Sequence, residues 1–529
     1  MTAVVKEPCD QGVILSKGTS AACTPQIGRW ILAATILASS MAFIDGTVVN
    51  VALPFLQKEL NATAIGVQWV VESYSLFLAA LLLVGGSLGD RYGRRLIFLI
   101  GVTIFALSSV ACGLAANIGQ LIAARAVQGI GGALLVPGSL AIISASFGES
   151  QRGKAIGTWS GFSAITTAIG PVLGGWLVEH FSWRAAFFLN IPLAAAVVMI
   201  SLWCVPESRE RGEPGSLDWL GAVSVTLGLG GVVYGLIESS RVGFSNSVVI
   251  GSLVSGFVIL CLFFFNEAFV KNPMVPLDLF RSRDFTGANL LTLFLYAALS
   301  AFMFFFTLNL IQIQHYSATA AGSSLLPFVV IMFSLSRWSG GLVDRYGPRL
   351  PLTIGPLVAA VGFALFAVPG TSASYWTSFF PAVVVLGLGM AIAVAPLTTT
   401  VMGSVSSEQA GVASGINNAV SRAAGLIAIA VFGVVMLYTF GHSLSGKLNA
   451  IPINDEIRVA LYERRVRLGG MEVPQSLEAA THKAVEDAVS ASFISGFRVV
   501  MMISVALSVA SAVSAWLLIG RLPSGVRRN

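Results

Sequence analysis

Two charged residues interrupt apolar stretches of the sequence that are long enough to cross a membrane. Along a helix, Asp45 lies about 22 Å from Trp30 and about 13 Å from Pro54. Arg125 lies so far inside another apolar run that its side chain cannot easily reach the surface. We expect it either to pair with Asp45 or to contact backbone carbonyls. An ionised carboxylate in hydrocarbon is costly, so we expect Asp45 to be paired, hydrated, or protonated for part of a cycle. Asp45 and Arg125 are predicted to serve proton coupling or substrate contact, against the alternative of a structural hydrogen bond to a neighbouring helix.

Other polar residues share these apolar runs. Glu72 is expected about one helical turn below the surface, where it either takes a direct role in coupling or substrate contact or simply reaches the interface. Arg422, beside Asn417 and Asn418, either lines a cavity or holds helices together. The residues predicted to line a cavity are Thr47, Asn50, Gln128, Asn417, Asn418 and Arg422.

The sequence contains no catalytic or metal-binding constellation. Its five cysteines form no CxxC pair, and its four histidines show no ligand spacing, so we expect neither disulfides nor a metal. The stretch Gly441–Leu448 resembles the start of a phosphate-binding loop, but Leu448 replaces the required Ser or Thr. We therefore expect no enzyme, no ATP drive and no cofactor. Lys and Arg sit singly in short turns and form no basic face, which argues against nucleic acid.

The composition indicates a membrane protein. Of 529 residues, 55% are hydrophobic and 11% are charged, whereas a soluble protein carries about 25% charged residues. A span needs about 20 apolar residues, and the sequence offers fourteen such runs, which predicts an all-α integral membrane fold. The runs cover approximately residues 30–53, 67–88, 96–115, 118–143, 155–178, 184–205, 217–237, 247–268, 285–311, 320–342, 350–368, 376–402, 411–440 and 493–519.

A charged turn between two of these runs occurs twice, as Gly86–Arg95 and as Gly340–Arg349. A glycine pair and a later proline also recur in order, which indicates two homologous halves. We interpret the repeated turns as paired gates at one membrane face; the alternative is a turn that only determines topology. The predicted gating residues are Gly86, Asp90, Arg91, Gly93, Arg94, Asp344, Arg345 and Gly347.

The repeat predicts the domain organisation. It divides the chain into a tail (1–29), a first six-helix half (30–205), an inserted two-helix segment with linkers (206–284), a second six-helix half (285–519) with a loop at about 441–491, and a tail (520–529). Basic residues gather in both tails and in the turns at Arg91–Arg95, Arg152–Lys154 and Arg345–Arg349. The positive-inside rule then places both termini in the cytoplasm and the 441–491 loop outside, where amphipathic stretches at 454–467 and 474–489 predict a small helical cap.

Four motifs together resemble the major facilitator superfamily and, more narrowly, its 14-helix drug:proton antiporter branch of the EmrB/QacA type. They are the helix-one pattern at Ile44–Pro54, the turn at Gly86–Arg95, the helix-four pattern at Leu121–Gly131 and the GPxxGG at Gly170–Gly175. The antiporter motif of helix five comprises Gly161, Gly170, Pro171, Gly174 and Gly175, small residues and a bend that let helices approach closely. The chain departs from the pattern at Glu72, Thr166 and Pro348.

The resemblance implies a major facilitator fold of two six-helix halves plus two inserted helices. It implies a transporter that exports hydrophobic or amphipathic small molecules by alternating access, driven by protons that neutralise Asp45, with Arg125 serving the proton step. An endogenous metabolite, lipid or siderophore remains an alternative cargo. A more distant alternative to a transporter is a membrane enzyme or sensor on the same fold. The expected setting is a bacterial inner membrane. A periplasmic adaptor and an outer-membrane channel are expected partners if the source has two membranes.

Overall fold

The computed structural model describes residues 25–147, 149–208, 218–270, 273–405 and 409–521. Of the described residues, 86% are helical and none lies in a strand. Thirteen helices within these ranges are long and apolar enough to cross a membrane. The helix over the fifth predicted span, α6, is also of spanning length, with 32 residues, but is richer in Gly, Ser and Thr. The predicted all-α membrane fold is confirmed; most of the two predicted tails lies outside the described residues.

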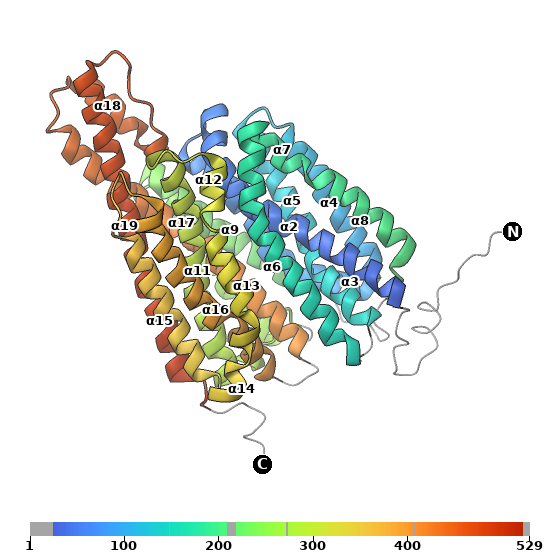
Figure 1. Ribbon diagram of the computed structural model, residues 1–529. Coiled ribbons are helices and arrows are strands. Elements are labelled where there is room, and N and C mark those ends of the chain that lie inside the picture. Colours follow the sequence, from blue (N-terminus) through green and yellow to red (C-terminus); the bar gives the residue numbers. More distant parts are fainter. Residues whose placement is uncertain (1–24, 148, 209–217, 271–272, 406–408, 522–529) are drawn as a thin grey trace.

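The helices form two groups joined by a pair (Figure 1). The first group consists of α2 (Pro25–Glu59), α3 (Ala64–Tyr92), α4 (Arg94–Gly113), α5 (Ile118–Ser146), α6 (Glu149–His180), α7 (Trp183–Phe188) and α8 (Asn190–Cys204). The pair consists of α9 (Trp219–Val242) and α10 (Ser247–Phe269). The second group consists of η1 (Leu277–Arg281), α11 (Arg283–Leu308), η2 (Asn309–Ile313), α12 (Ala318–Ser323), α13 (Leu326–Gly340), α14 (Leu342–Tyr346), α15 (Arg349–Phe366), η3 (Tyr375–Phe379), α16 (Phe380–Gly403), α17 (Ala410–Leu448), α18 (Asp455–Glu463), η4 (Arg464–Gly470) and α19 (Ala479–Leu518).

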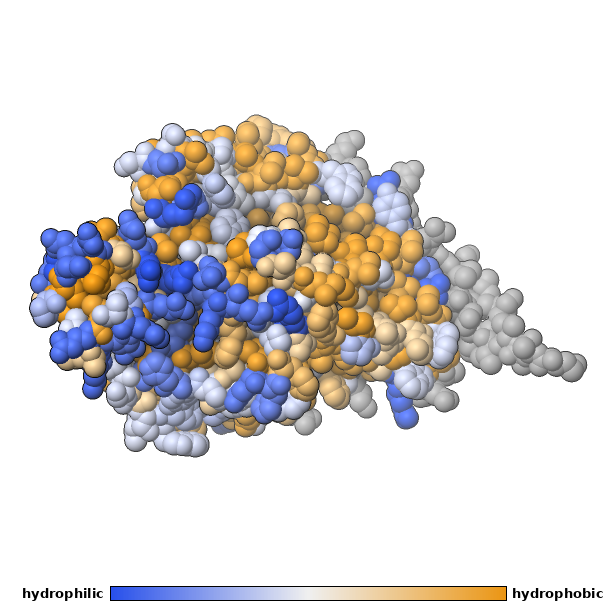
Figure 2. All heavy atoms as spheres, turned by 90° about the horizontal axis from the view of Figure 1, so that it is seen from above, coloured by the Kyte–Doolittle hydropathy of each residue, from blue (hydrophilic) through white to orange (hydrophobic). Residues whose placement is uncertain are grey.

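The two ends of the bundle differ. At 39 and 40 residues, α17 and α19 are each about 60 Å long, twice the roughly 30 Å of a hydrocarbon core. They project at one end, where α18 and η4 join them into a cap (Figure 1); we call this the cap end. Seen from there, hydrophilic residues gather on the cap, while hydrophobic residues cover much of the remaining surface (Figure 2). We call the opposite end, which carries both repeated charged turns, the turn end.

Several helices extend beyond the ranges that the apolar pattern predicts. The first begins at Pro25 rather than Trp30, and the segment predicted as a loop over 441–491 contains the last turns of α17 and the first turns of α19. The amphipathic stretch at 474–489 mostly belongs to α19 and is not a separate cap helix. The reason is physical: an apolar run marks only the part of a helix inside lipid, and a helix continues into water while its polar residues permit it.

The inserted pair lies at the periphery of the bundle. In the apolar segment of α10, only 17% of the residues are buried in the protein, whereas 67% are buried in that of α3. Phe257 and Phe265 are 66% and 65% exposed, as expected for side chains that meet lipid. The partner helix α9 contacts both α3 and α17, so the pair covers the junction between the groups on one side.

The recurring glycines place helices in close contact at matching points of the two groups. A Cβ on Gly129 would lie 2.4 Å from the carbonyl oxygen of Tyr74 in α3, and one on Gly131 would lie 2.6 Å from Phe105 N in α4. In the second group, a Cβ on Gly389 would lie 2.4 Å from Ala359 N in α15. No larger residue fits at such distances, so the glycines fix how tightly α5 and α16 pack against their neighbours.

The two groups meet at the cap end. A Cβ on Gly175 in α6 would lie 2.4 Å from the carbonyl oxygen of Ala318 in α12. In α3, Gln68 donates from Nε2 to the carbonyl oxygen of Ile429 in α17, at 3.0 Å. The cap adds a third contact, since Gln57 Nε2 donates to the carbonyl oxygen of Arg467 in η4, at 3.0 Å. Toward the turn end the ribbons of α6 and α13 diverge (Figure 1), whereas α17 still contacts α3, where a Cβ on Gly415 would lie 3.1 Å from Leu83 Cδ2.

Candidate functional site

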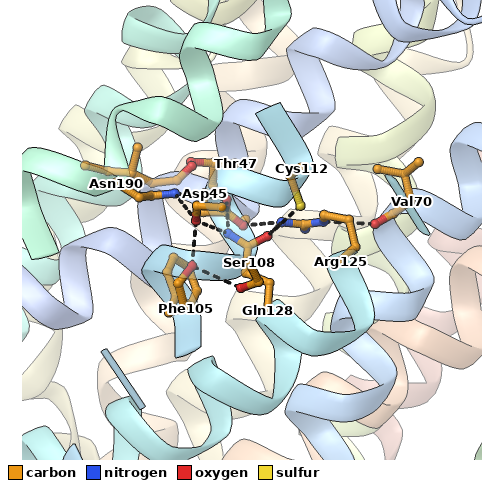
Figure 3. Close-up of polar contacts among 12 residues, drawn as sticks. Asp45, Thr47, Val70, Phe105, Ser108, Cys112, Arg125, Gln128 and Asn190 are labelled. Atoms are coloured by element: carbon orange, nitrogen blue, oxygen red, sulfur yellow. Dashed lines mark hydrogen bonds and ion pairs between the residues drawn. The ribbon is translucent and has the colours of Figure 1, made fainter. Parts of the chain in front are cut away.

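Five side chains from four helices converge inside the first group, and we call them the central polar cluster (Figure 3). They are Asp45 from α2, Ser109 from α4, Arg125 and Gln128 from α5, and Asn190 from α8. Each is buried, with 0–2% of its surface exposed. The predicted pairing of Asp45 with Arg125 is present, and Gln128, predicted only as a cavity residue, lies between them.

The guanidinium of Arg125 is held on several sides. Its Nη1 forms an ion pair with Asp45 Oδ2 and donates to Gln128 Oε1 at 2.7 Å. Its Nε donates to the carbonyl oxygen of Val70 at 3.1 Å. The ring of Tyr74 covers it, with Arg125 Cζ 4.2 Å from the ring centroid, which adds a cation–π contact. Arg125 therefore has one charge partner and a fixed orientation.

The second carboxylate oxygen of Asp45 is also satisfied. Oδ1 accepts from Gln128 Nε2 at 2.8 Å and from Asn190 Nδ2 at 3.3 Å. Ser109 Oγ accepts from the same two amide groups, at 2.8 and 3.2 Å. A buried ion pair is stable only when further hydrogen bonds satisfy its remaining atoms. This geometry suits an ionised Asp45, and a proton on that carboxylate would remove the charge that holds Arg125.

Helix geometry explains how one helix supplies two members of the cluster. Arg125 and Gln128 are three residues apart on α5 and so project from one face. The neighbouring Gly129 and Gly131 let α5 approach α3 and α4 closely. That close approach brings the face of α5 within hydrogen-bonding distance of the helices around it.

Glu72 lies apart from the central polar cluster and is fully buried in the protein. It does not reach the interface: its exposed fraction is 0%, and neither carboxyl oxygen has a hydrogen-bond partner among the described residues. On α3 it shares a stripe with Trp69 and Leu76, which pack in one apolar cluster with residues of α9 and α17 such as Val233 and Leu426. Glu72 therefore faces the junction of the two groups and the inserted pair.

The remaining predicted cavity residues make local contacts. Thr47 Oγ1 donates to the carbonyl oxygens of Phe43 and Ile44 in its own helix, and Asn50 Nδ2 donates to Gly46 O at 3.4 Å. Asn418 donates to its own helix at Ser414 O, 3.0 Å away.

In the second group, Asn417 and Arg422 behave differently. Asn417 Nδ2 bridges to Asn289 Oδ1 and Thr292 Oγ1 in α11, at 3.1 and 2.7 Å. Arg422 is half-buried and has neither an ion pair nor a hydrogen bond with the residues that the structure describes. Among the predicted cavity residues, Arg422 therefore best fits a residue that contacts substrate, because its charge has no partner in the described part of the chain.

The repeated turns have the conformation that their glycines permit. Gly93 has φ +120° and Gly347 has φ +73°, values that favour glycine. Asp90, near the end of α3, pairs with Arg94, the first residue of α4, at 2.8 Å. In both turns the arginine stacks on the next tyrosine, as Arg91 on Tyr92 and Arg345 on Tyr346. Gly86 faces Pro137 of α5. The side chain of Asp344 is not among those that the structure describes.

The helix-five motif serves two contacts. Gly170 and Gly174 pack against Thr47 and Val48 of α2. On the other side, Gly175 packs against α12, and Pro171 O approaches Gly322 of α12. Gly161 lies in the same helix, with its side-chain position outside the described set. The motif thus lets α6 approach both its own group and the opposite one.

Sequence reasoning missed Ser109, Asn190, Tyr74 and the carbonyl of Val70. Asn190 had a usable signal, since it is an amide inside a predicted span, and Ser109 a weaker one, because serines are common in membrane helices. Across the described ranges, no group of three His, Cys, Asp or Glu side chains is placed to hold a metal. The chemistry that this arrangement supports is the binding and release of a proton at a buried carboxylate beside a fixed arginine.

Comparison with known proteins identifies the family. The model of the Major Facilitator Superfamily matches residues 35–429. The chain belongs to the major facilitator superfamily. As a member, it is a multi-pass membrane transporter rather than an enzyme.

Relatives with named activities cover nearly the whole transporter. It is 33% identical over 499 residues to the multidrug resistance protein Stp of Mycobacterium tuberculosis, covering 92% of this chain and 91% of the relative. It is 30% identical over 487 residues to the tetracenomycin C resistance and export protein of Streptomyces glaucescens, covering 92% and 90%.

Solved structures of transporters share the fold. A bacterial homologue of the human lysosomal transporter Spinster, inward-facing and unoccupied, superposes with a TM-score of 0.64 at 18% identity, covering 93% of this chain and 98% of that one. The xylose transporter XylE from E. coli, in an inward-open conformation, gives a TM-score of 0.55 at 14% identity, covering 94% and 97%.

Proposed function

We propose that this transporter exports hydrophobic or amphipathic drugs in exchange for protons, without ATP or a cofactor. The observation that carries the proposal is the buried ion pair of Asp45 and Arg125, a titratable group inside a span and away from water. Such groups in transporters mark ion and proton paths. The similarity to multidrug and antibiotic resistance proteins supports the drug cargo.

The coupling step follows from the geometry of the central polar cluster. When Asp45 is ionised, it holds Arg125, Gln128 and Asn190 around itself. Protonation of Asp45 cancels the charge pair and frees the guanidinium, so that the hydrogen bonds among α2, α5 and α8 must rearrange. Drug and proton thereby favour different states of the same cluster, which is what antiport requires.

We place the turn end on the cytoplasmic side of a bacterial inner membrane, because the arginines of both repeated turns lie there. Both chain termini are then cytoplasmic. In this orientation the cap end faces outward and is joined, so the structure corresponds to an inward-facing state. In a bacterium with two membranes, the cap end is also where a periplasmic adaptor, leading to an outer-membrane channel, would bind. The charge pattern gives no reason to expect nucleic acid.

Closing the cap end depends on Gly175. In Gly175→Ala, the added methyl group would meet the carbonyl oxygen of Ala318 at 2.4 Å, so we expect α6 and α12 to separate and the outward-open fraction to rise. Gly157→Ala is the matched control. Gly157 lies on the same helix, and a Cβ there would meet nothing within 4 Å. Spin labels at Phe181 and Val368, on a cysteine-free background, measure the separation. Equal distances in the two variants would contradict this role.

Glu179 ties the two groups together at the cap end. Its Oε2 accepts from Thr319 Oγ1 at 2.6 Å and from Thr319 N at 3.1 Å. These hydrogen bonds, first that of the Thr319 side chain, lower the pKa of Glu179 below its ordinary value of 4.5. A lowered carboxyl pKa means that its stabilisation is complete above pH 4.5 and is lost as the pH falls through the lowered value.

We therefore expect the closed cap end to loosen in acid, and Glu179→Gln to loosen it at neutral pH. The same pair of spin labels, read from pH 7 down to about pH 3, checks both expectations. Glu59→Gln is the control, because Glu59 lies at the cap end but bonds to Trp183 and Arg184 within its own group. If the distance between the labels depends on pH in Glu179→Gln as it does in wild type, the ionised Glu179 does not hold the cap end closed.

Glu72 is proposed as a second acidic contact for coupling or for cationic cargo. It lacks a partner in the described part of the chain and faces α9 and α17, so its carboxyl group is available when the halves separate. We expect Glu72→Gln to preserve folding and to lower resistance to cationic drugs more than resistance to neutral ones. Minimal inhibitory concentrations for both drug classes, in a host without its own pumps, give the comparison; an equal loss for both classes would remove this role.

The proposed function is tested in proteoliposomes of the purified transporter. An imposed pH gradient should drive accumulation of a substrate drug, and collapse of the gradient with an ionophore should stop it. Drug movement that ignores the gradient would refute antiport. No movement of any drug, together with gradient-driven movement of an endogenous lipid, metabolite or siderophore, would keep the mechanism and change the cargo.

A further inference from the structure

The two repeated turns differ in how their arginines are neutralised. In the first half, Glu207 follows α8 and returns to the start of α4. Its Oε1 and Oε2 accept from Arg95 N and Leu96 N at 3.0 and 3.1 Å. Arg95 Nη1 donates to the carbonyl oxygen of Val205 at 2.9 Å, and Arg95 Nε lies 3.9 Å from Glu207. An internal carboxylate thus caps α4 and pairs with the arginine.

The second half repeats this arrangement without the acid. Arg349 corresponds to Arg95 in the repeated turn and donates to the carbonyl oxygen of Trp516 in α19, as Arg95 does at the end of α8. Glu207 lies two residues after Val205, which is the C-cap of α8. In the second half, Arg521 lies two residues after Ile519, which is the C-cap of α19. The position that supplies a carboxylate in the first half supplies a cation in the second.

Three arginines meet there, and none of them forms an ion pair with an acid among the described residues. Arg283, Arg349 and Arg521 line one pocket of about 460 Å³ at the end of α19. Arg283 Nη2 donates to the carbonyl oxygen of Leu517 at 3.3 Å. The nearby acid, Asp284, accepts from Gly520 N at 2.7 Å and forms no ion pair with any of the three.

Two sets of donors at the start of α15 lack partners. Among the described residues, no side chain is found to accept from the first backbone N–H groups of α15, the helix that Arg349 begins, although Glu207 accepts from those of the corresponding helix α4. Arg349 Nε is buried and has no hydrogen-bond partner in the described part of the chain. An anion placed as Glu207 is placed in the first half would accept from the start of α15 and pair with the guanidinium of Arg349, and phosphate oxygens pair well with arginine forks and helix N-termini.

The surroundings identify the source of the anion. Trp516 and Leu517 are 47% and 61% exposed, and Leu350 is 42% exposed, so apolar surface that meets acyl chains adjoins the arginines. The guanidinium of Arg349 lies 4.4 Å from the ring centroid of Trp516, an aromatic residue typical of the membrane interface. We propose that this pocket binds the phosphate of an anionic phospholipid, which completes the second-half turn as Glu207 completes the first.

The test is lipid binding to the purified full-length transporter by native mass spectrometry, with phosphatidylglycerol and phosphatidylcholine compared. We expect wild type to prefer phosphatidylglycerol. Removing one cation, in Arg283→Ala, should weaken that lipid about fivefold, and reversing one, in Arg521→Glu, about twentyfold or more. Arg521→Glu rebuilds the first-half arrangement and so should compete with the lipid internally. Arg281→Ala is the control, because Arg281 is exposed and pairs with Asp278.

The outcomes separate the alternatives. An unchanged preference for phosphatidylglycerol in both Arg283→Ala and Arg521→Glu would overturn the proposal. If glycerol 3-phosphate displaces phosphatidylglycerol at equal concentration, the pocket takes a soluble phosphate and the lipid assignment is wrong. If Arg521→Glu does not fold, Arg283→Ala decides. The readout is binding, so it stands or falls independently of drug transport.

Discussion

Asp45→Asn is expected to reduce drug transport driven by a pH gradient to the level of empty vesicles. Asparagine has the same shape and keeps an oxygen that can accept from Gln128 and Asn190, so the helices should remain packed. What it loses is the charge that holds Arg125 and the ability to bind a proton. The measurement is drug accumulation in proteoliposomes with an imposed pH gradient.

Asp278→Asn is the matched control for this variant. The side chain of Asp278 is 82% exposed, and among the described residues its ion-pair partner is Arg281, which is not part of the central polar cluster. We expect it to transport at the wild-type rate. Transport by Asp45→Asn that still follows the pH gradient would mean that another group carries the proton.

Arg125→Met is expected to be the most destabilising of the single substitutions considered. It leaves Asp45 buried with a charge and without its cation, and breaking a buried pair in this way costs about 3–5 kcal/mol. Methionine keeps most of the side-chain volume, so the loss reflects charge more than packing. The double variant with Asp45→Asn removes the orphaned charge and should recover most of the stability. Thermal unfolding of the purified variants in detergent gives the comparison.

Two outcomes would contradict this account of the pair. One is an unfolding temperature for Arg125→Met equal to that of wild type. The other is a double variant no more stable than the single one, which would assign the loss to the contact of Arg125 with the Tyr74 ring or with the Val70 carbonyl.

The sequence predicts the helices and the central pair well because both follow from burial in lipid. Apolar runs have to be helical in a membrane, and two opposite charges inside such runs have strong reason to meet. The repeat of glycines predicts two homologous halves, and Gly131 and Gly389 make close helix contacts at matching points of the two groups. The predicted division into domains and the roles of the gating turns stay predictions.

Other features depend on contacts between distant segments and could not be read from the sequence. The complete burial of Glu72 follows from α9 and α17 packing over α3, which its position near one end of a span does not reveal. The partner of Arg95 is Glu207, 112 residues further along the chain. Asn190 and Ser109 join the central polar cluster only because α8 and α4 turn those faces inward. Single polar residues in a span do not say which neighbour they meet.

The central claim is that drug and proton compete through Asp45. The most direct measurement is proton release when a substrate drug is added to the purified transporter in weakly buffered detergent solution. The account predicts that wild type releases protons on binding, and that Asp45→Asn still binds the drug, by fluorescence, but releases none. Equal proton release from both proteins would contradict it.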